Sequence, residues 1–203
     1  MEREQIAERV KDNMIMLARS GRWLGGTTPL GYASVRVEKE GNALKKKSMY
    51  CLTQNPDEID LAKFIFTYFM EKRSLTEVLR YLMAGGIRTR SGREFYISGI
   101  RDILVNPVYC IADEAGYQYF YDLGCQVCID PEELDQESGL LGYARTTSAM
   151  YRNEGTPCES WIISRGRHKG IVTGKEFVYV QQLLAGNRSK GDNFRDTKNS
   201  VAL

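Results

Sequence analysis

Arginine side chains gather between residues 88 and 101 in a stretch with the residue types that bind nucleic acid. Arg88, Arg90 and Arg93 surround a Ser-Gly turn, and Arg101 follows further along the chain. The planar guanidinium group can hold a phosphate or the O6/N7 edge of a guanine. The pattern fits two structures equally well: a basic surface that contacts DNA, and a helical hairpin with a solvated basic loop.

A second candidate stretch runs from Arg19 to Gly26, with the sequence RSGRWLGG. A flexible glycine-rich segment that carries arginine can lie in the minor groove of DNA, where narrow A·T tracts concentrate negative potential. The alternative is an ordinary linker with two solvated arginines and a tryptophan packed on the domain. Taken alone, the residues favour that alternative.

Cys125 and Cys128 form a CxxC pair, which raises the question of a metal site. A structural zinc site needs four ligands, usually as two close pairs, and the other three cysteines are scattered. We therefore predict no metal and no cofactor, with two reduced cysteines alternating around Val127 on a strand. His168, the single histidine, stands in the polar run RGRHK and is predicted to be a loop residue without a nucleophile partner.

The overall composition is that of a soluble globular protein: 203 residues, 42% hydrophobic and 27% charged. The net charge of +2 hides an uneven distribution, because Lys45–Lys47 and residues 88–101 are basic whereas residues 113–137 are acidic. Such a distribution suits a protein that presents one face to a polyanion, although charge runs are usually solvated surface. With no signal peptide, no apolar run of roughly 20 residues and only five cysteines, we expect a cytoplasmic protein without a membrane span.

The first half of the chain alternates helical and β-like patterns. Apolar residues at helical spacing predict a leading helix over residues 1–20, and residues 30–37 and 48–53 read as two strands around a polar tip at Gly41-Asn42. Asn55-Pro56 opens a helix that ends near residue 73, and the capping box Ser74 to Glu77 opens a second that stops at Gly85-Gly86. Two short extended pieces over 87–95 precede a third helix over 97–105.

Two short helices joined in this way are the skeleton of helix-turn-helix DNA readers, and the long connection favours a winged or hairpin-bearing variant. The C-terminal half is less regular. We expect a helix or strand over 117–121, an acidic surface helix or loop over 131–138, a polar mobile segment over 142–157, a short strand over 161–163 and a capped helix from Thr173.

The fold class expected from these elements is α+β: a projecting N-terminal helix, then a mixed helical domain with short β-hairpins and a helix-turn-helix or winged-helix-like core. The predicted division is a connecting helix over 1–20, a linker over 21–28, one domain over 29–186 and a flexible tail over 187–203.

Three runs in this order resemble the large serine recombinases, over about Glu2 to about Ser189. The run IAERVKDNMIMLARSGRWLGGTTPLGY is similar to their junction between a long helix and the recombinase domain. SLTEVLRYLMAGGIRTRSGREFYISGIRDILVNPVYCI resembles the centre of that domain, with its G-I-x-T-x-x-G turn and closing I-L-x-N-P-V-Y. GRHKGIVTGKEFVYVQQLL resembles the segment before the zinc ribbon.

The resemblance implies binding of double-stranded attachment-site DNA by a dimer on each site, a tetramer in synapsis, and strand cleavage by a serine nucleophile. It also implies a helix in the major groove and the Gly-rich linker along the minor groove. Carried over to this sequence, Arg19, Arg22, Trp23 and Gly25 take the linker role, and Arg88, Thr89, Arg90, Arg93, Ser98 and Arg101 lie at or near the major-groove face.

The same resemblance places the catalytic domain before Met1 and the zinc ribbon after Leu203. We therefore expect a fragment that binds DNA without cutting it and has no catalytic residue of its own. A stand-alone winged-helix-type regulator is the alternative, and it would be expected to cap or bury the leading helix. A protein-interaction domain is a third possibility, and its binding would be indifferent to DNA.

Overall fold

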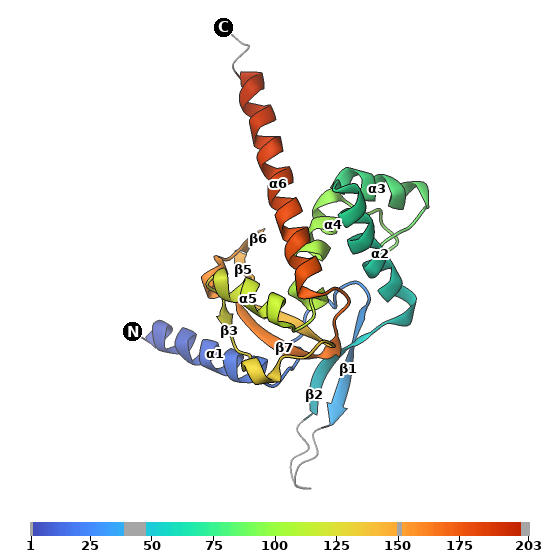
Figure 1. The fold of residues 1–203 in the computed structure, drawn as a ribbon. Coiled ribbons are helices and arrows are strands. Elements are labelled where there is room, and N and C mark those ends of the chain that lie inside the picture. Colours follow the sequence, from blue (N-terminus) through green and yellow to red (C-terminus); the bar gives the residue numbers. More distant parts are fainter. Residues whose placement is uncertain (1, 39–47, 150–151, 200–203) are drawn as a thin grey trace.

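The computed structural model describes residues 2–38, 48–149 and 152–199. Helices and small sheets form a mixed body, which confirms the predicted α+β class. Three elements project from this body in different directions: α1 (Glu2–Arg19), the hairpin of β1 (Tyr32–Glu38) and β2 (Ser48–Gln54), and α6 (Gly174–Asn199) (Figure 1).

Helix α1 is attached to the body only at its C-terminal end. Ala18 is fully buried and α1 contacts β7, whereas Ile6 and Val10 are 56% and 54% exposed. The leading helix is thus confirmed, but its periodic apolar residues do not all face a core. Because the first turns extend beyond the body, the described residues offer these two side chains nothing to pack against.

The β1–β2 hairpin has the predicted antiparallel pairing, with Tyr32 opposite Gln54 and Glu38 opposite Ser48. Met49 and Cys51 are buried, and β2 lies beside β7. The predicted polar tip and the lysine cluster at 45–47 lie outside the described residues.

Three consecutive helices form one side of the body, and side-chain caps open the first two. In α2 (Pro56–Lys72) the Asn55 side chain accepts the Asp57 N–H at 3.2 Å, and the helix ends at Arg73 in the left-handed conformation. For α3 (Leu75–Ala84), the Ser74 hydroxyl accepts the Glu77 N–H at 3.4 Å. Helix α3 then packs against both α2 and α4 (Ile97–Leu104).

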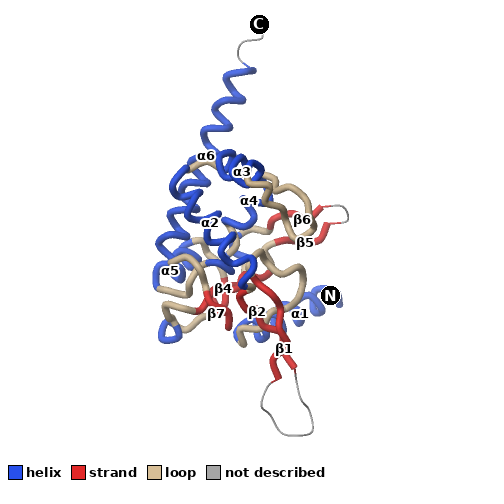
Figure 2. Tube along the Cα trace, turned by 90° about the vertical axis from the view of Figure 1, so that its right-hand side faces the viewer, coloured by secondary structure: helices blue, strands red, loops and turns tan. Residues whose placement is uncertain are grey.

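A three-stranded sheet forms the other side, in the order β3 (Gln126–Val127), β7 (Ile162–Lys169), β4 (Ser138–Tyr143). Strand β3 is parallel to β7 and β4 is antiparallel to it. Helix α5 (Glu114–Asp122), the helical option for 117–121, packs against α6. Single 3-10 turns cover Pro107–Tyr109, Pro131–Glu133 and Cys158–Ser160. Figure 2 shows this sheet and the helical side in one view.

Two predicted irregular segments are regular in the structure. Instead of a mobile stretch over 142–157, β5 (Thr146–Ala149) pairs antiparallel with β6 (Arg152–Gly155). The base of this hairpin is closed by the Thr156 N–H, which donates to the Arg145 carbonyl at 3.0 Å. Instead of a flexible tail from residue 187, α6 continues to Asn199. No proline interrupts this segment, and each added residue gains one hydrogen bond on a helix that is already nucleated.

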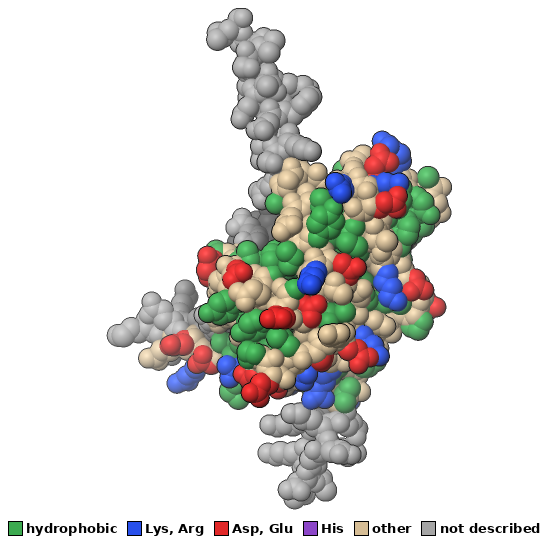
Figure 3. Space-filling view, in the orientation of Figure 1, with side chains coloured by type: hydrophobic (Ala, Val, Ile, Leu, Met, Phe, Trp, Pro, Cys, Tyr) green, Lys and Arg blue, Asp and Glu red, His purple; other side chains and the backbone are tan. Residues whose placement is uncertain are grey.

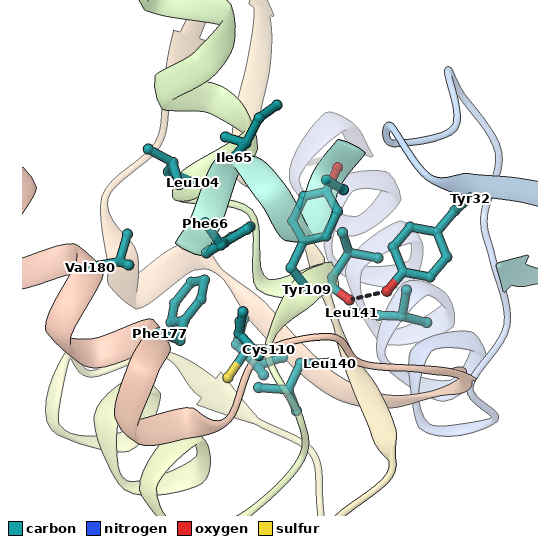
Figure 4. Packing of buried hydrophobic residues seen from close by; sticks show 14 of the residues in the cluster. Tyr32, Ile65, Phe66, Leu104, Tyr109, Cys110, Leu140, Leu141, Phe177 and Val180 are labelled. Atoms are coloured by element: carbon teal, nitrogen blue, oxygen red, sulfur yellow. Dashed lines mark hydrogen bonds between the residues drawn. The ribbon is translucent and has the colours of Figure 1, made fainter. Parts of the chain in front are cut away.

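One hydrophobic cluster joins the helices to the β1–β2 hairpin and the three-stranded sheet, from Ala18 at the end of α1 to Leu184 in α6. Figure 4 shows its centre, where the ring of Phe66 in α2 lies 5.3 Å from the ring of Tyr109. The rings of Tyr32 and Tyr109 are 5.7 Å apart, and burial raises the pKa of both phenols. The helical and sheet sides therefore share a single core.

The prediction for His168 is wrong: it is a core residue on β7 and only 3% exposed. Its Nε2 lies 2.9 Å from the Val108 carbonyl oxygen, and burial lowers the pKa of the imidazole to about 4. Gly139 and Gly166 make room for the ring, since a Cβ at either would lie within 2.4 Å of it. The surrounding residues are polar, but strand alternation turns every second side chain inward.

His168 predicts a loss of stability in mild acid. The pKa of this imidazole is about 4 in the folded chain and about 6.5 in the unfolded chain. Between these pH values the unfolded chain binds a proton at His168 and the folded chain does not. As the pH falls from about 6.5 to about 5, this costs the folded state about 2 kcal/mol. The variant His168→Gln keeps a donor for the Val108 carbonyl but does not titrate in this range. Urea unfolding at the two pH values should therefore give a smaller decrease in its free energy of unfolding than in that of the original chain. Equal losses in both proteins would contradict the prediction.

Candidate nucleic-acid interface

Helices α3 and α4 meet through buried apolar side chains on facing turns. Val78 and Leu82 of α3 and Ile100 and Leu104 of α4 are fully buried. Phe95, 6% exposed, fastens the connection between the helices to the same core. The helix-turn-helix skeleton predicted from the sequence is therefore present as a packed pair.

The connection between α3 and α4 is a turn without strands, so the predicted wing is not confirmed. The Thr89 N–H donates to the Arg93 carbonyl at 2.8 Å, and the Gly92 N–H donates to the Thr89 carbonyl at 2.8 Å. Gly92 has φ +74, a conformation that glycine adopts without strain. One tight turn thus satisfies the local backbone groups, and no further pairing extends it into a hairpin.

Helix α4 is held firmly at its C-terminal end. Gln181 of α6 donates to the Leu104 carbonyl at 2.8 Å, and Arg145 donates to the Asn106 side chain at 2.9 Å. The Arg145 guanidinium also lies 5.2 Å from the centre of the Trp161 ring. These contacts fix the direction of α4 relative to the body.

The other end of α4 faces solvent. Tyr96, at the N-cap, makes no side-chain cap hydrogen bond and is 67% exposed, and Ile97 is 44% exposed. Ser98 is also exposed, whereas Arg101 is half-buried. Helix α4 is thus anchored at its C-terminal end and open to solvent at its N-terminal end.

The sequence missed Tyr96 and Ile97 as candidate contact residues. An apolar residue at the start of a short helix is normally counted toward the core, and only the tertiary packing leaves this pair uncovered. Their exposure is the signal, and it cannot be read from the spacing of apolar residues.

The predicted arginines have different environments. Arg88 lies in an exposed ion pair with Glu94, with 2.9 Å between Nη1 and Oε1. Arg93 is exposed on the turn. Thr89 contributes to the turn itself, since its hydroxyl donates to the Arg93 carbonyl at 3.1 Å. Arg88 and Arg93 are therefore exposed on the turn that precedes α4, and Thr89 is a structural member of that turn.

Arg90 is bound within the chain. Its Nε and Nη2 donate to the two carboxylate oxygens of Glu58 at 2.7 and 2.5 Å. Nη1 donates to the carbonyl and the hydroxyl of Thr28, and Nη2 donates to the carbonyls of Pro29 and Tyr32. A guanidinium has five N–H groups, and these contacts occupy them. In this arrangement Arg90 has no donor left for a phosphate or a base.

Most of the predicted linker lies on the body. The Trp23 N–H donates to the Tyr50 carbonyl at 2.7 Å, and the Tyr143 hydroxyl donates to the Arg22 carbonyl. Gly21, buried at φ +65, passes close to β7. Gly25, Gly26 and Thr27 are exposed, and both glycines have positive φ and no atom within 4 Å of an added Cβ. The flexible part of the linker is therefore short, and Trp23 packs on the domain while Arg19 is exposed.

A groove of about 260 Å³ lies between the end of the linker and α4. It is lined by Thr27, Thr28 and Leu30 at the end of the linker and by Tyr96, Gly99 and Ile103 around α4. Two segments that are far apart in the sequence, around residues 27–30 and 96–103, thus share one surface. The fold places the linker end beside the open face of α4.

Charges are mixed over the described surface rather than segregated. On the face drawn in Figure 3, Lys and Arg side chains alternate with Asp and Glu side chains. Arg165, for example, pairs with Asp135 of the acidic stretch at 3.3 Å. The uneven charge along the sequence does not become a basic half on this face, because folding brings acidic and basic segments together.

The cysteines are free thiols, and Cys125 and Cys128 flank β3. Burial raises the pKa of Cys125 to about 11, so its thiol is protonated at neutral pH. Within residues 2–38, 48–149 and 152–199, no three His, Cys, Asp or Glu side chains are grouped so as to hold a metal ion. In the same ranges, no helix has the length and apolar character that a membrane crossing requires.

Comparison with protein families decides the class of the chain. The sequence model of the family described as Recombinase matches residues 56–187, from the start of α2 into α6. The chain belongs to the Recombinase family. The match covers α3, the basic turn and α4, and it confirms the family resemblance seen in the sequence.

Comparisons with solved structures and with curated proteins give less information about this chain. A crystal structure of an LSR–DNA complex is 16% identical to this Recombinase chain, with a TM-score of 0.46. That similarity covers 87% of this chain and 38% of the other, so the chain spans well under half the length of that protein. No curated protein matches the sequence.

Gly31 predicts a sharp difference between two glycine substitutions. It has φ +83, and an added Cβ would lie 2.9 Å from Ile59 Cδ1 and 3.1 Å from its Cα. Gly31→Ala should therefore lower the free energy of unfolding by more than about 2 kcal/mol. Gly86→Ala, at φ +64 in open space, should cost only about 1 kcal/mol. Urea unfolding measures both, and equal losses would contradict the close packing of the linker end on α2.

Proposed function

We propose that this chain is the DNA-binding part of a large serine recombinase and that it binds double-stranded attachment-site DNA. The observation that carries the proposal is the groove that joins the linker end to the open face of α4. It provides one surface for a helix in the major groove and an adjoining segment in the minor groove. Family membership supports the same function.

The division of labour on this surface follows from exposure. Arg93 and Ser98 border the end of α4 that faces solvent, whereas Arg101 lies half-buried in its last turn. We assign all three to contacts with base edges or phosphates. Gly25 and Gly26 carry no side chain and lie open, so their backbone can approach a narrow minor groove closely. Arg22 and Arg19 precede them and would contact phosphates.

DNA recognition, not cleavage, is the role proposed for this chain. The serine nucleophile, the dimer on each site and the synaptic tetramer belong to the complete recombinase. The linker is proposed to connect α1 to the DNA-binding domain that begins at about residue 29. The projection of α1 favours this function over a stand-alone winged-helix-type regulator, because such a protein would be expected to cover Ile6 and Val10.

The first test is a fluorescence-anisotropy titration against duplex DNA from the ends of the host element, with random duplex alongside. Arg93→Ala and Arg101→Ala should each weaken binding to the cognate site by about 1–3 kcal/mol if they read bases, and by less on random DNA. A residue that contacts a phosphate should instead lower the slope of log K against log salt by about 0.9.

Lys63→Ala, an exposed lysine of α2 paired with Asp60 at 3.5 Å, is the control and should change neither quantity. Binding no tighter to the cognate site than to random DNA, and unaffected by either arginine substitution, would overturn the proposed function.

Ile97 should read thymine methyl groups, because exposed apolar side chains on a major-groove helix contact them. Replacing thymine by uracil removes only the methyl group, so the substituted cognate duplex should bind about 1 kcal/mol less tightly. Ile97→Ala should be insensitive to the replacement. Equal sensitivity of the variant and the original chain would exclude this contact.

A further inference from the structure

The segment from residue 28 to residue 32, here called the clamped segment, is fastened at each of its five carbonyl groups. The donors are Arg90 for Thr28, Pro29 and Tyr32, the Tyr109 hydroxyl for Leu30, and the Asn55 N–H for Gly31. Arg90 alone supplies three of these contacts. A connection between two elements is normally far less constrained, because loops run over the surface and bind water.

Glu58 completes the arrangement from the first turn of α2. Its carboxylate binds Arg90 through both oxygens and also accepts the Gly31 N–H at 3.2 Å. Its hydrogen bonds to Arg90 lower the pKa of Glu58, so the carboxylate stays ionised. The pair thus ties together α2, the turn before α4, and the clamped segment.

The constraint ends abruptly next to the clamped segment. Gly25 and Gly26 have open space around them, and Thr27 is exposed. Arg90 and Thr28 both line the groove that the linker end shares with α4. The position of the clamped segment therefore determines where the open glycines stand relative to the exposed end of α4.

We propose that Arg90 and Glu58 are a positioning pair that sets the spacing between the linker and α4 without touching DNA. The inference rests on the proposed function, and it gives Arg90 a role different from contact with the major groove of DNA. Without the hydrogen bonds from Arg90, residues 28–32 would have to become ordered when DNA binds. The conformational entropy lost in that step would weaken the affinity for DNA.

Two conservative variants separate positioning from direct contact. Arg90→Lys keeps the charge but cannot bridge several acceptors with a planar fork. Glu58→Gln keeps the shape but removes a negative charge, which by long-range electrostatics alone would tighten binding to DNA. We expect both variants to weaken specific binding about tenfold, with an unchanged salt slope.

Matched controls are available on the same chain. Arg165→Lys alters another arginine that binds a carboxylate and a backbone carbonyl, with a similar side-chain exposure of 39% against 37% for Arg90. Glu77→Gln removes an equivalent negative charge from α3, where Glu77 pairs with Arg80. Arg165→Lys should leave the affinity for the cognate site unchanged, and Glu77→Gln should not weaken it.

Amide hydrogen exchange over residues 28–32, measured without DNA, gives an independent readout. Exchange there should accelerate in Arg90→Lys and Glu58→Gln while the melting temperature shows a folded protein. The positioning role would be overturned if Arg90→Lys retained its affinity or lowered the slope of log K against log salt. It would also be overturned if Glu58→Gln bound DNA more tightly, or if amide exchange over residues 28–32 were unchanged in the variants. If the original chain does not distinguish the cognate site, the proposed function fails, whereas the exchange measurement still reports on the clamp.

Discussion

The short segment Pro107–Cys110 is the buried joint on which the rest of the structure depends. Its four residues are buried, so their backbone polar groups must find partners inside the protein. The partners are the Tyr32 hydroxyl and His168 Nε2 for the Val108 carbonyl, the Ile171 and Val172 N–H groups for the Tyr109 carbonyl, and the Leu140 N–H for the Cys110 carbonyl. One segment thereby connects β1, β4, β7 and the approach to α6. Because an unpaired buried backbone group is costly, these elements can meet in only a narrow range of arrangements.

This joint also explains how α4 is presented. The segment begins at Pro107, shortly after α4 ends at Leu104, so the C-terminal end of the helix lies next to this buried backbone. Arg145 and Gln181 add contacts from the β4–β5 connection and from α6. The Tyr109 hydroxyl reaches back to the Leu30 carbonyl at 2.8 Å and so places the linker end beside the helix. Both parts of the proposed DNA surface therefore take their positions from one core.

Much of the fold could be predicted from local patterns. Asn55 and Ser74 mark helix starts because their side-chain oxygens satisfy N–H groups that the helix leaves open, and the structure has both caps. The β1–β2 hairpin follows from alternation and composition in the same way. The β5–β6 hairpin and the burial of His168 could not be predicted, because polar residues there are stabilised by strand pairing and by a distant carbonyl rather than by their neighbours. The candidate stretch at residues 88–101 was predicted from its arginines, but the hydrogen bonds of Arg90 to Glu58 and Tyr32 were not.

By itself, the sequence determined the limits of the capped helices, the α+β class and the family, because these depend on residue order over short distances and on motifs that folding does not change. Only the tertiary structure decided which candidate side chains are available. Arg90 and Arg93 are equivalent in type and nearly adjacent, yet one is held by Glu58 and the clamped segment whereas the other is exposed. Ile97 likewise matches a core pattern and stays open to solvent. The physical reason is that hydrogen bonding and burial depend on partners distant in the chain, which no local pattern contains.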